Sequence, residues 1–476
     1  MLWLIVLAIV ALLAVIIVRA ALFTPKEEET VAPAQEAFSQ EDAVRILQEM
    51  IQIKTVSYRD GSLEDEREFA RFDEMLPKWF PGVFSTCSHE KVSPRSWLFC
   101  WKGESSDNPG VLMAHYDVVP ANEDAWEEPP FSGTIRDGVL WGRGAIDTKI
   151  TVMGVLQSVE TLISEGFQPQ NDLYLAFAGN EEISGDGAPA IVRWFEKKGI
   201  KPAFVLDEGG AVVEKVFPGV SQPAAMVGIA EKGPTDVTLT IETAGGHAST
   251  PPPRTSVGRL AKAVTRIEKH PFPFTLTPPV KQLFDRMGRR STFLYRVIFA
   301  NLWCFAPLLN LICKLSGGEL NALVRTTVAF TQMQGSSASN VLPPKATVGA
   351  NLRLIPGQTV EDAREYLQKQ TGDNDIRVDV VFGMNPSPVS TTEGAPWEHL
   401  EKAIRATWQG VIVTPYLMLA CSDSRHYGQI CDRVYRFSAM ALTKEERAMI
   451  HGNNERIPLE TIAKTVTFYR QFIKMC

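Results

Sequence analysis

The feature that most restricts the fold is a regular alternation of short apolar runs and amphipathic segments after residue 110. The runs predict buried strands at 110–115, 172–178 and 201–206. The amphipathic segments predict helices at 148–165 and 187–198, each followed by a glycine that ends it. Strand, helix, strand, helix, strand is the order of an α/β fold, in which helices cover the faces of a mainly parallel sheet.

Composition changes after about Lys232, and the change marks a second unit. Alternating apolar and polar side chains predict half-exposed strands at 234–243 and 347–354, with a helix at 257–269. Pro356-Gly357 then interrupts the chain before a helix predicted at 360–370. A chain of 476 residues is also too long for one ordinary core. We therefore expect an α/β catalytic domain formed by residues 39–232 and 356–476, and an inserted α+β lid at 233–355.

The N-terminus predicts a membrane anchor. Leu2–Val18 is an unbroken apolar run that crosses most of a hydrocarbon core, and residues 20–23 can extend it. A retained anchor at 1–23 is favoured over a cleaved signal peptide, because no basic segment precedes the run and no clear small-residue cleavage site follows it. Residues 24–38, rich in Glu, Ala and Pro, are predicted to be a tether.

Charge gives little information about topology and argues against nucleic acid. Arg19 and Lys26 follow the span, but Glu27, Glu28 and Glu29 come next and leave its orientation open. We expect the catalytic domain on the extracytoplasmic or lumenal side of the membrane, or a secreted protein if the segment is cleaved. The net charge of -7 gives no electrostatic reason to bind nucleic acid, and none is expected as a partner.

Seven cysteines are scattered without a Cys-x-x-Cys pair, which argues against a thiolate zinc site. Cys87 with Cys100, and Cys421 with Cys431, are candidate disulfides, and buried free thiols are the alternative.

Acidic and imidazole side chains stand where open α/β sheets build their sites. Three groups of side chains lie at the ends of the predicted strands: His115 with Asp117, Glu181 with Glu182, and Asp207. Asp147 lies just before the first predicted helix. Singly, each has a structural alternative, such as a helix cap or a turn residue. Gathered carboxylates repel one another unless a cation neutralises them. Imidazoles with carboxylates suit zinc, with manganese or cobalt as substitutes.

The joint set of motifs resembles the M20 family of metallopeptidases. The matching segments are His115-Tyr-Asp-Val-Val-Pro, Gly142-Arg-Gly-x-x-Asp, Asn180-Glu-Glu, Asp207-Glu-Gly-Gly, Gly245-Gly-His-Ala-Ser, Asn340-Val-Leu-Pro, Arg353, Ser422-Asp-Ser-Arg and His451-Gly. The resemblance covers nearly all of the chain after the tether. Trp126-Glu-x-Pro-Pro-Phe-Ser-Gly and His451-Gly-x-Asn-Glu are similar in particular to the subgroup of N-fatty-acyl-amino-acid synthase/hydrolases and Gly-Xaa carboxypeptidases.

This resemblance implies a hydrolase with two zinc ions that cuts an amide bond beside a free carboxylate, as a carboxypeptidase or an N-acyl-amino-acid hydrolase. Short peptides or N-acyl amino acids would be the substrates. The implied metal ligands are the bridging Asp147, His115 and Asp207 on one ion, and Glu182 and His451 on the other. Asp117 would orient His115, and Glu181 would be the general base.

The resemblance also implies residues that bind substrate and a homodimer that forms through the lid. His247 would reach a neighbouring subunit's site and stabilise the oxyanion. Asn340 and Arg353 resemble a clamp for the substrate carboxylate, because an Arg fork binds a carboxylate through two hydrogen bonds. The expected lining of the same pocket is Ser422, Asp423 and Arg425.

Two questions stay open at this level. A catalytically inactive receptor or scaffold of the same family is the alternative function, disfavoured because all ligand positions and Glu181 are present. The zinc residues do not separate peptide from fatty-acyl substrates. The apolar segment 293–315 admits three interpretations: lid core, a site for an acyl tail, or contact with the bilayer beside the anchor.

Overall fold

The structure is a computed structural model that describes residues 1–26 and 29–476, so Glu27 and Glu28 of the predicted tether lie outside the described residues. Its larger sheet has eight strands in the order β1-β2-β6-β3-β7-β16-β8-β15. Their bounds are β1 (Ser88–Ser93), β2 (Ser96–Trp101), β3 (Ser105–His115), β6 (Asn171–Ala178), β7 (Phe204–Val213), β8 (Ala224–Glu231), β15 (Ile412–Met418) and β16 (Val434–Ala441). The central strands β6, β3, β7 and β16 are parallel, whereas β1, β2 and β8 form antiparallel pairs. The sheet is therefore mixed, with a parallel centre as the sequence predicts.

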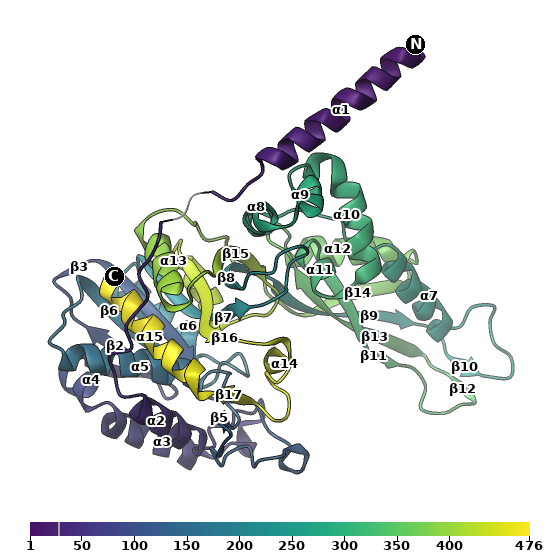
Figure 1. Cartoon of the computed structure of the whole chain (residues 1–476). Helices are drawn as coiled ribbons and strands as arrows, with labels where there is room; N and C mark the ends of the chain where they lie inside the picture. The colour runs from purple at the N-terminus through teal and green to yellow at the C-terminus, as the bar shows by residue number, and fades with distance from the viewer. Residues whose placement is uncertain (27–28) are drawn as a thin grey trace.

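Helices cover both faces of this sheet (Figure 1). One face carries α2 (Gln40–Ile51), α3 (Glu66–Trp79), α4 (Pro81–Thr86), α5 (Lys149–Ser164), α13 (Ala395–Thr407) and α15 (Leu459–Met475). The other carries α6 (Gly187–Lys198) and the short 3-10 helix η3 (Asp423–Gln429). The predicted helices at 148–165 and 187–198 are confirmed, and α6 ends at Gly199 in a left-handed conformation. Because α15 packs against α5, the C-terminal part of the chain belongs to the same unit as the first strands.

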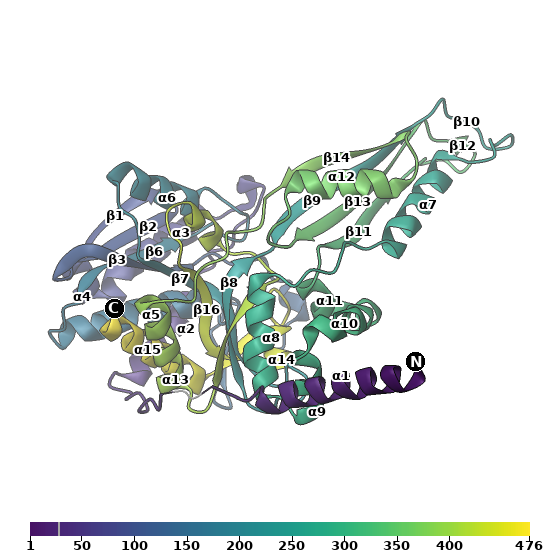
Figure 2. The same cartoon turned by 90° about the horizontal axis from the view of Figure 1, so that it is seen from above.

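A second sheet of four antiparallel strands forms a separate core (Figure 2). It consists of β9 (Gly233–Glu242), β11 (Thr327–Gln334), β13 (Lys345–Leu354) and β14 (Ile376–Gly383), packed on α7 (Ser256–Lys269) and α12 (Val360–Thr371). The predicted lid boundary at 355 is wrong, because α12 and β14 follow it and β14 pairs with β9. Pro356-Gly357 is a turn inside this unit, and does not mark the return to the larger sheet.

The helices α8 (Pro278–Arg290), α9 (Phe293–Phe299), α10 (Leu302–Ser316) and α11 (Gly318–Leu323) come from the same inserted stretch. They contribute to a third apolar cluster with β8 and β15 of the larger sheet, whose members include Leu283, Phe284, Ala230 and Leu417. The interpretation of residues 293–315 as lid core is wrong for much of the segment. Its side chains include Leu294, Trp303 and Leu315, which are 72%, 59% and 79% exposed.

Three smaller elements position distant parts of the chain. A three-stranded sheet of β4 (Ile135–Arg136), β5 (Val139–Trp141) and β17 (Arg456–Pro458) joins the C-terminal segment after α14 (Lys444–Arg447) to the segment before α5. β10 (Gly246–His247) and β12 (Val341–Leu342) pair at the far tip of the lid (Figure 2). α1 (Leu2–Leu22) projects away from the body (Figure 1). All cysteines are free thiols, so neither candidate disulfide forms.

Candidate metal centre

The site begins at the carboxyl ends of two adjacent parallel strands. β3 ends at His115 directly beside Ala178 at the end of β6, and Gly179, Asn180, Glu181 and Glu182 follow β6. This register brings the imidazole of His115 to the loop that carries the two glutamates. His115 Nε2 lies 3.9 Å from Glu181 Oε2. The predicted meeting of these strand ends is therefore found in the structure.

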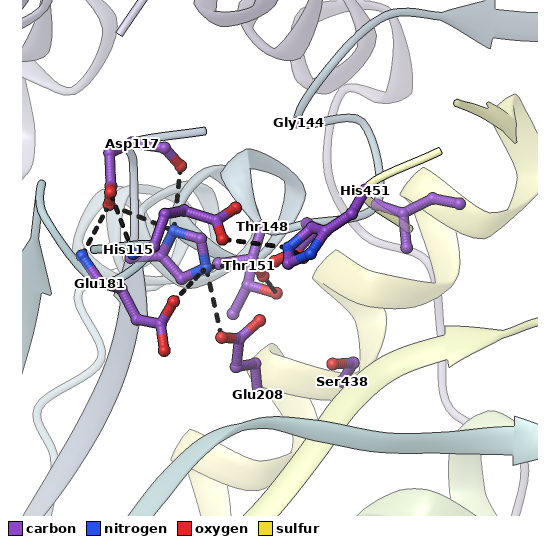
Figure 3. A network of polar contacts seen from close by, with 12 residues as sticks. His115, Asp117, Gly144, Thr148, Thr151, Glu181, Glu208, Ser438 and His451 are labelled. Carbon is purple, nitrogen blue, oxygen red and sulfur yellow. Dashed lines mark hydrogen bonds and ion pairs between the residues drawn. The ribbon is translucent and has the colours of Figure 1, made fainter. Parts of the chain in front are cut away.

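The third strand contributes a residue that the sequence analysis missed. The pairing of β16 with β7 runs from Arg436 opposite Asp207 to Phe437 opposite Gly210, so that Glu208 and Gly209 form a bulge. A bulge re-aims the side chain that it carries, and Gly209 has a φ of 142°, which favours glycine. The carboxylate of Glu208 consequently lies 3.2 Å from His115 Nε2 (Figure 3).

Asp207 does not occupy the position expected of it. It is buried in β7, and its Oδ2 accepts a hydrogen bond of 3.0 Å from the backbone N–H of Ser424. Adjacent residues of a strand point to opposite sides, so only one of this Asp-Glu pair can meet His115. Glu208 lies beside His115, so the structure does not place Asp207 where the sequence prediction puts it. The Gly-Gly pair after Asp-Glu was the sequence signal for the bulge.

Asp147 lies between the two imidazoles. Its Oδ1 is 3.1 Å from His115 Nε2, and its Oδ2 is 3.1 Å from His451 Nε2. The same His451 nitrogen is 3.0 Å from Glu182 Oε2. The arrangement is the one expected of a carboxylate that bridges two ions, with His115 and Glu208 on one side and Glu182 and His451 on the other.

Asp117 contacts both His115 and the loop that carries Glu181 and Glu182. Its backbone carbonyl lies 3.0 Å from His115 Nδ1, which leaves Nε2 facing the centre. Its carboxylate accepts the backbone N–H groups of Glu181 and Glu182 at 3.1 and 3.2 Å, and the hydroxyl of Ser57 donates to it. Asp117 is completely buried. It therefore positions the imidazole and both glutamates at once.

A second buried carboxylate, Glu455, positions Asp147 in the same way, and the sequence analysis gave it no role. It accepts the backbone N–H groups of Gly144, Ile146 and Asp147 at 3.1, 2.7 and 3.1 Å. It also forms a buried ion pair of 2.8 Å with Arg143. Because Glu455 follows His451 by only a few residues, it ties the loop that carries Asp147 to the loop that carries His451.

The crowding of charges shifts the protonation of the whole group. Burial raises the pKa of Glu208 to about 8 and the pKa of Glu181 well above its usual value. Hydrogen bonds to Asp147 and Glu182 raise the pKa of His451 to about 10. Buried carboxylates that repel one another hold protons unless a cation replaces them. The cluster therefore attracts and stabilises positive charge.

The donor set fits a pair of divalent cations. Two groups, His115 with Asp147 and Glu182, and His115 with Glu181 and Glu208, each place one ligand atom per residue within 4.8 Å of the others. Glu182 Oε1 is buried and has no hydrogen-bond partner in the described part of the chain, so it is free to bind a metal. Imidazole and carboxylate donors suit zinc and similar ions.

The predicted pocket residues at 422–425 lie beside this centre. Ser422 donates its backbone N–H to Glu231 Oε2 at 3.0 Å, and Glu231 is paired with the fully buried Arg436. Asp423 is buried, and burial raises its pKa to about 7. Arg425 is half-buried and acts on the carboxylate of Asp423 with its positive charge. Arg353, at the end of β13, lies 3.4 Å from Cys421 Sγ through its Nη1, at the start of the same segment.

His247 and Asn340 do not join the centre within one chain. Both are exposed, and they lie together at the tip of the lid, where the carbonyl of Asn340 accepts the backbone N–H of Ala248 at 2.9 Å. His247 Nδ1 lies 2.7 Å from the hydroxyl of Ser249. The tip is the part of the lid farthest from the larger sheet (Figure 2). Their predicted roles therefore require a second subunit.

An apolar cavity of about 300 Å³ begins next to the centre. Gly209 follows Glu208 and lines the cavity, as does Ile450, which precedes His451. The lining also includes Leu320 and Leu323 of α11 and Phe284 of α8, together with the charged residues Glu319 and Arg447. The cavity is therefore lined both by sequence neighbours of Glu208 and His451 and by residues of α8 and α11.

Comparison with known proteins gives one family. The sequence profile of peptidase family M20/M25/M40 matches residues 111–475. The N-fatty-acyl-amino acid synthase/hydrolase PM20D1 of Xenopus tropicalis is 41% identical over 90% of this chain and 85% of its own length. The probable carboxypeptidase S-like 2 of Dictyostelium discoideum is 37% identical, over 88% of this chain and 82% of its own.

Solved structures show the same fold at low identity. The M20 family metallo-carboxypeptidase Sso-CP2 of Sulfolobus solfataricus aligns with a TM-score of 0.67 at 17% identity, and covers 91% of this chain and 98% of its own. Human carnosine dipeptidase 1 aligns with a TM-score of 0.62 at 14% identity, over 92% of this chain and 96% of its own.

Proposed function

The chain belongs to peptidase family M20/M25/M40 and is a metal-dependent amide hydrolase, and we propose that it uses two zinc ions to cleave N-acyl amino acids with long apolar acyl chains. The alternative of an inactive receptor or scaffold has no support among these relatives. The observation that carries the substrate proposal is the apolar cavity beside Glu208 and His451.

We assign the metal ligands from the geometry of the centre. His115 and Glu208 would hold one ion, Glu182 and His451 the other, with Asp147 between them. Glu208 replaces Asp207 in this assignment. When bound, the ions supply an acidified water and polarise the amide carbonyl.

The residues around the ions carry the proton and the substrate. Glu181 is farther from His115 Nε2 than Glu208 is, at 3.9 against 3.2 Å, which leaves its carboxylate free to take a proton from the attacking water. Once Glu181 has taken that proton, it can give it to the leaving amine. Asp117 fixes the base, because it accepts the backbone N–H of Glu181. Arg353 would bind the free carboxylate of the amino acid, with Ser422, Asp423 and Arg425 lining the pocket.

The cavity favours an acyl chain over a second amino acid. Its walls include the apolar side chains of Phe217, Phe284, Leu323 and Ile450, and a buried methylene contributes about 0.8 kcal/mol to binding. The lining also contains the charged residues Glu319 and Arg447, so the preference for a hydrocarbon tail rests on the apolar majority of its walls. A lining of this kind selects a long hydrocarbon tail.

A substrate series tests the proposal. kcat/KM should rise steeply from N-acetyl to N-oleoyl phenylalanine, with Gly-Leu and other dipeptides cleaved more slowly than the long-chain compounds. The measurement uses purified protein in detergent with its zinc retained. A flat response to acyl length, together with faster dipeptide cleavage, would make the protein a carboxypeptidase and leave the cavity without a role in catalysis.

We further propose that α1 is a retained anchor and that the catalytic domain lies on the extracytoplasmic or lumenal face. α1 is 21 residues long with a mean hydropathy of 3.0. Its contacts with the body support retention over cleavage: Arg19 donates to Ala300 O at 2.9 Å, and Asn301 Nδ2 donates to Ile16 O at 3.1 Å. Removal of this segment as a signal peptide would break these hydrogen bonds to the body.

We also propose a homodimer through the lid. β11 and β14 are the edge strands of the four-stranded sheet, and an edge strand can pair with its copy across a twofold axis. Such a dimer would bring His247 and Asn340 of one chain toward the centre of the other. His247 could then donate to the oxyanion of the substrate.

A further inference from the structure

The corner between α9 and α10 is fastened to the last two turns of α1. Arg19 donates to the carbonyl of Ala300 and, at 3.1 Å, to Asn301 Oδ1. Asn301 is fully buried, and its Nδ2 donates to the carbonyls of Ile16 and Val297 at 3.1 and 2.9 Å. Ile16 and Ala20 are the buried residues of α1. The corner and this end of α1 therefore form one packed unit (Figure 1).

The position of this contact along α1 fixes its depth in a membrane. Leu2–Leu22 has 21 residues and is about 32 Å long, and the hydrocarbon core of a bilayer is about 30 Å thick. Nearly all of α1 is needed to cross such a core. Ile16 lies about 9 Å before the end of the helix. If α1 spans the bilayer, the corner at Ala300-Asn301 lies within the leaflet nearer the catalytic domain.

The side chains around the corner are apolar, as a position within the leaflet requires. The exposed apolar residues of α9 and α10 are Phe293, Leu294, Tyr295, Trp303, Leu308, Leu311, Ile312 and Leu315. Leu294 and Leu315 are 72% and 79% exposed, and α9 and α10 meet at a bend of 102°. An apolar surface of this kind is unusual on a protein that faces water. Two short helices bent at such an angle fit an element that dips into one leaflet and returns.

Basic side chains stand where the headgroups would lie. A groove of about 590 Å³ is lined by residues of α1, α8 and the corner, which include Arg19, Lys281, Arg289 and Trp303, together with Asp285, which pairs with Arg289 at 2.9 Å. Arg289 donates to the carbonyl of Thr24 at 3.1 Å and stacks over Phe23, so it marks the point where α1 ends. Cations with an aromatic residue at the edge of an apolar surface match the phosphates and interface of a phospholipid bilayer.

We propose that the α9–α10 corner inserts into the phospholipid bilayer beside α1, as a second membrane contact that holds the molecule in a fixed orientation. This inference rests on the proposed anchor. The cavity beside the metal centre is walled by α11, which directly follows α10. The insertion therefore places the wall of the cavity next to the leaflet in which a long acyl chain dissolves.

Photolabelling of the full chain tests the proposal. The protein is reconstituted into phosphatidylcholine vesicles that contain a phospholipid with a diazirine in its acyl chain, illuminated, digested and mapped by mass spectrometry. We expect adducts on α1 and also on the α10 peptide that contains Leu311 and Leu315. Adducts on α1 alone would refute the inserted corner while the anchor stands. Adducts on neither would refute the anchor as well.

Matched variants distinguish insertion of the α9–α10 corner from nonspecific adsorption to the bilayer. The double variant Leu311→Glu with Leu315→Glu should lower labelling of α10 by about tenfold, because transfer of charged side chains into hydrocarbon costs a few kcal/mol. Labelling of α1 should stay unchanged. The control is Val381→Glu with Phe382→Glu on β14, where the two side chains are 69% and 43% exposed. Equal loss of α10 labelling in this control would overturn the assignment of the surface.

Discussion

Leu320→Trp should shorten the acyl chain that the protein can use. Leu320 lines the wall of the cavity formed by α11 and is 37% exposed, so that a larger side chain can be accommodated without unfolding. An indole exceeds the leucine side chain by about six heavy atoms and, in a cavity of about 300 Å³, would exclude about four methylenes. At about 0.8 kcal/mol for each methylene, the loss is about 3 kcal/mol, or about 200-fold in kcat/KM.

The loss should depend on the length of the substrate. The acetyl group of N-acetyl phenylalanine would be too short to reach α11, so its kcat/KM should stay within about twofold of the wild type, whereas N-oleoyl phenylalanine should show the full loss. Leu63→Trp is the matched control, since Leu63 is 63% exposed and lies outside the cavity lining. A uniform decrease for every acyl length would refute the reasoning, because it would show damage to the metal centre instead of a shortened cavity.

Three further experiments test the centre and the dimer. Glu208→Gln should lower metal affinity far more than Asp207→Asn, because of the two carboxylates only Glu208 faces His115. The measurement is zinc content after dialysis, and the reverse order would restore the assignment of Asp207 made from the sequence. Glu455→Gln should weaken metal binding by about 10–100-fold with the fold intact by circular dichroism, because Glu455 orients the loop that carries Asp147. Mixing His247→Ala chains with Glu181→Gln chains should restore activity through mixed dimers with one complete site, and no rescue after proven subunit exchange would contradict the shared site.

The sequence predicts the central sheet well because its signals are local. Short apolar runs, helical spacing and terminal glycines identify β3, β6, α5 and α6. The boundary of the lid was placed too early because strand pairing is not local. Nothing in residues 376–383 announces that β14 pairs with β9, which lies more than a hundred residues earlier.

The site divides in the same way. The residues His115, Asp117, Asp147, Glu182 and His451 were predicted from motifs, and the structure brings them together. The choice between Asp207 and Glu208 depends on a bulge, which shifts the side of the strand on which a residue lies and leaves only paired glycines in the sequence. The role of Glu455 was not predicted, because this carboxylate acts by accepting backbone N–H groups. The motif His451-Gly-x-Asn-Glu contains Glu455 but does not indicate which backbone groups its carboxylate accepts.

The metal content of the active protein tests the central claim most directly. Protein purified without added chelator should contain two divalent ions per chain by elemental mass spectrometry, with zinc as the native metal, since the donors are imidazoles and carboxylates around a shared Asp147. Hydrolysis of N-oleoyl phenylalanine should disappear on chelation and return when zinc is restored. Full activity in protein that holds less than one metal ion per chain would contradict the account.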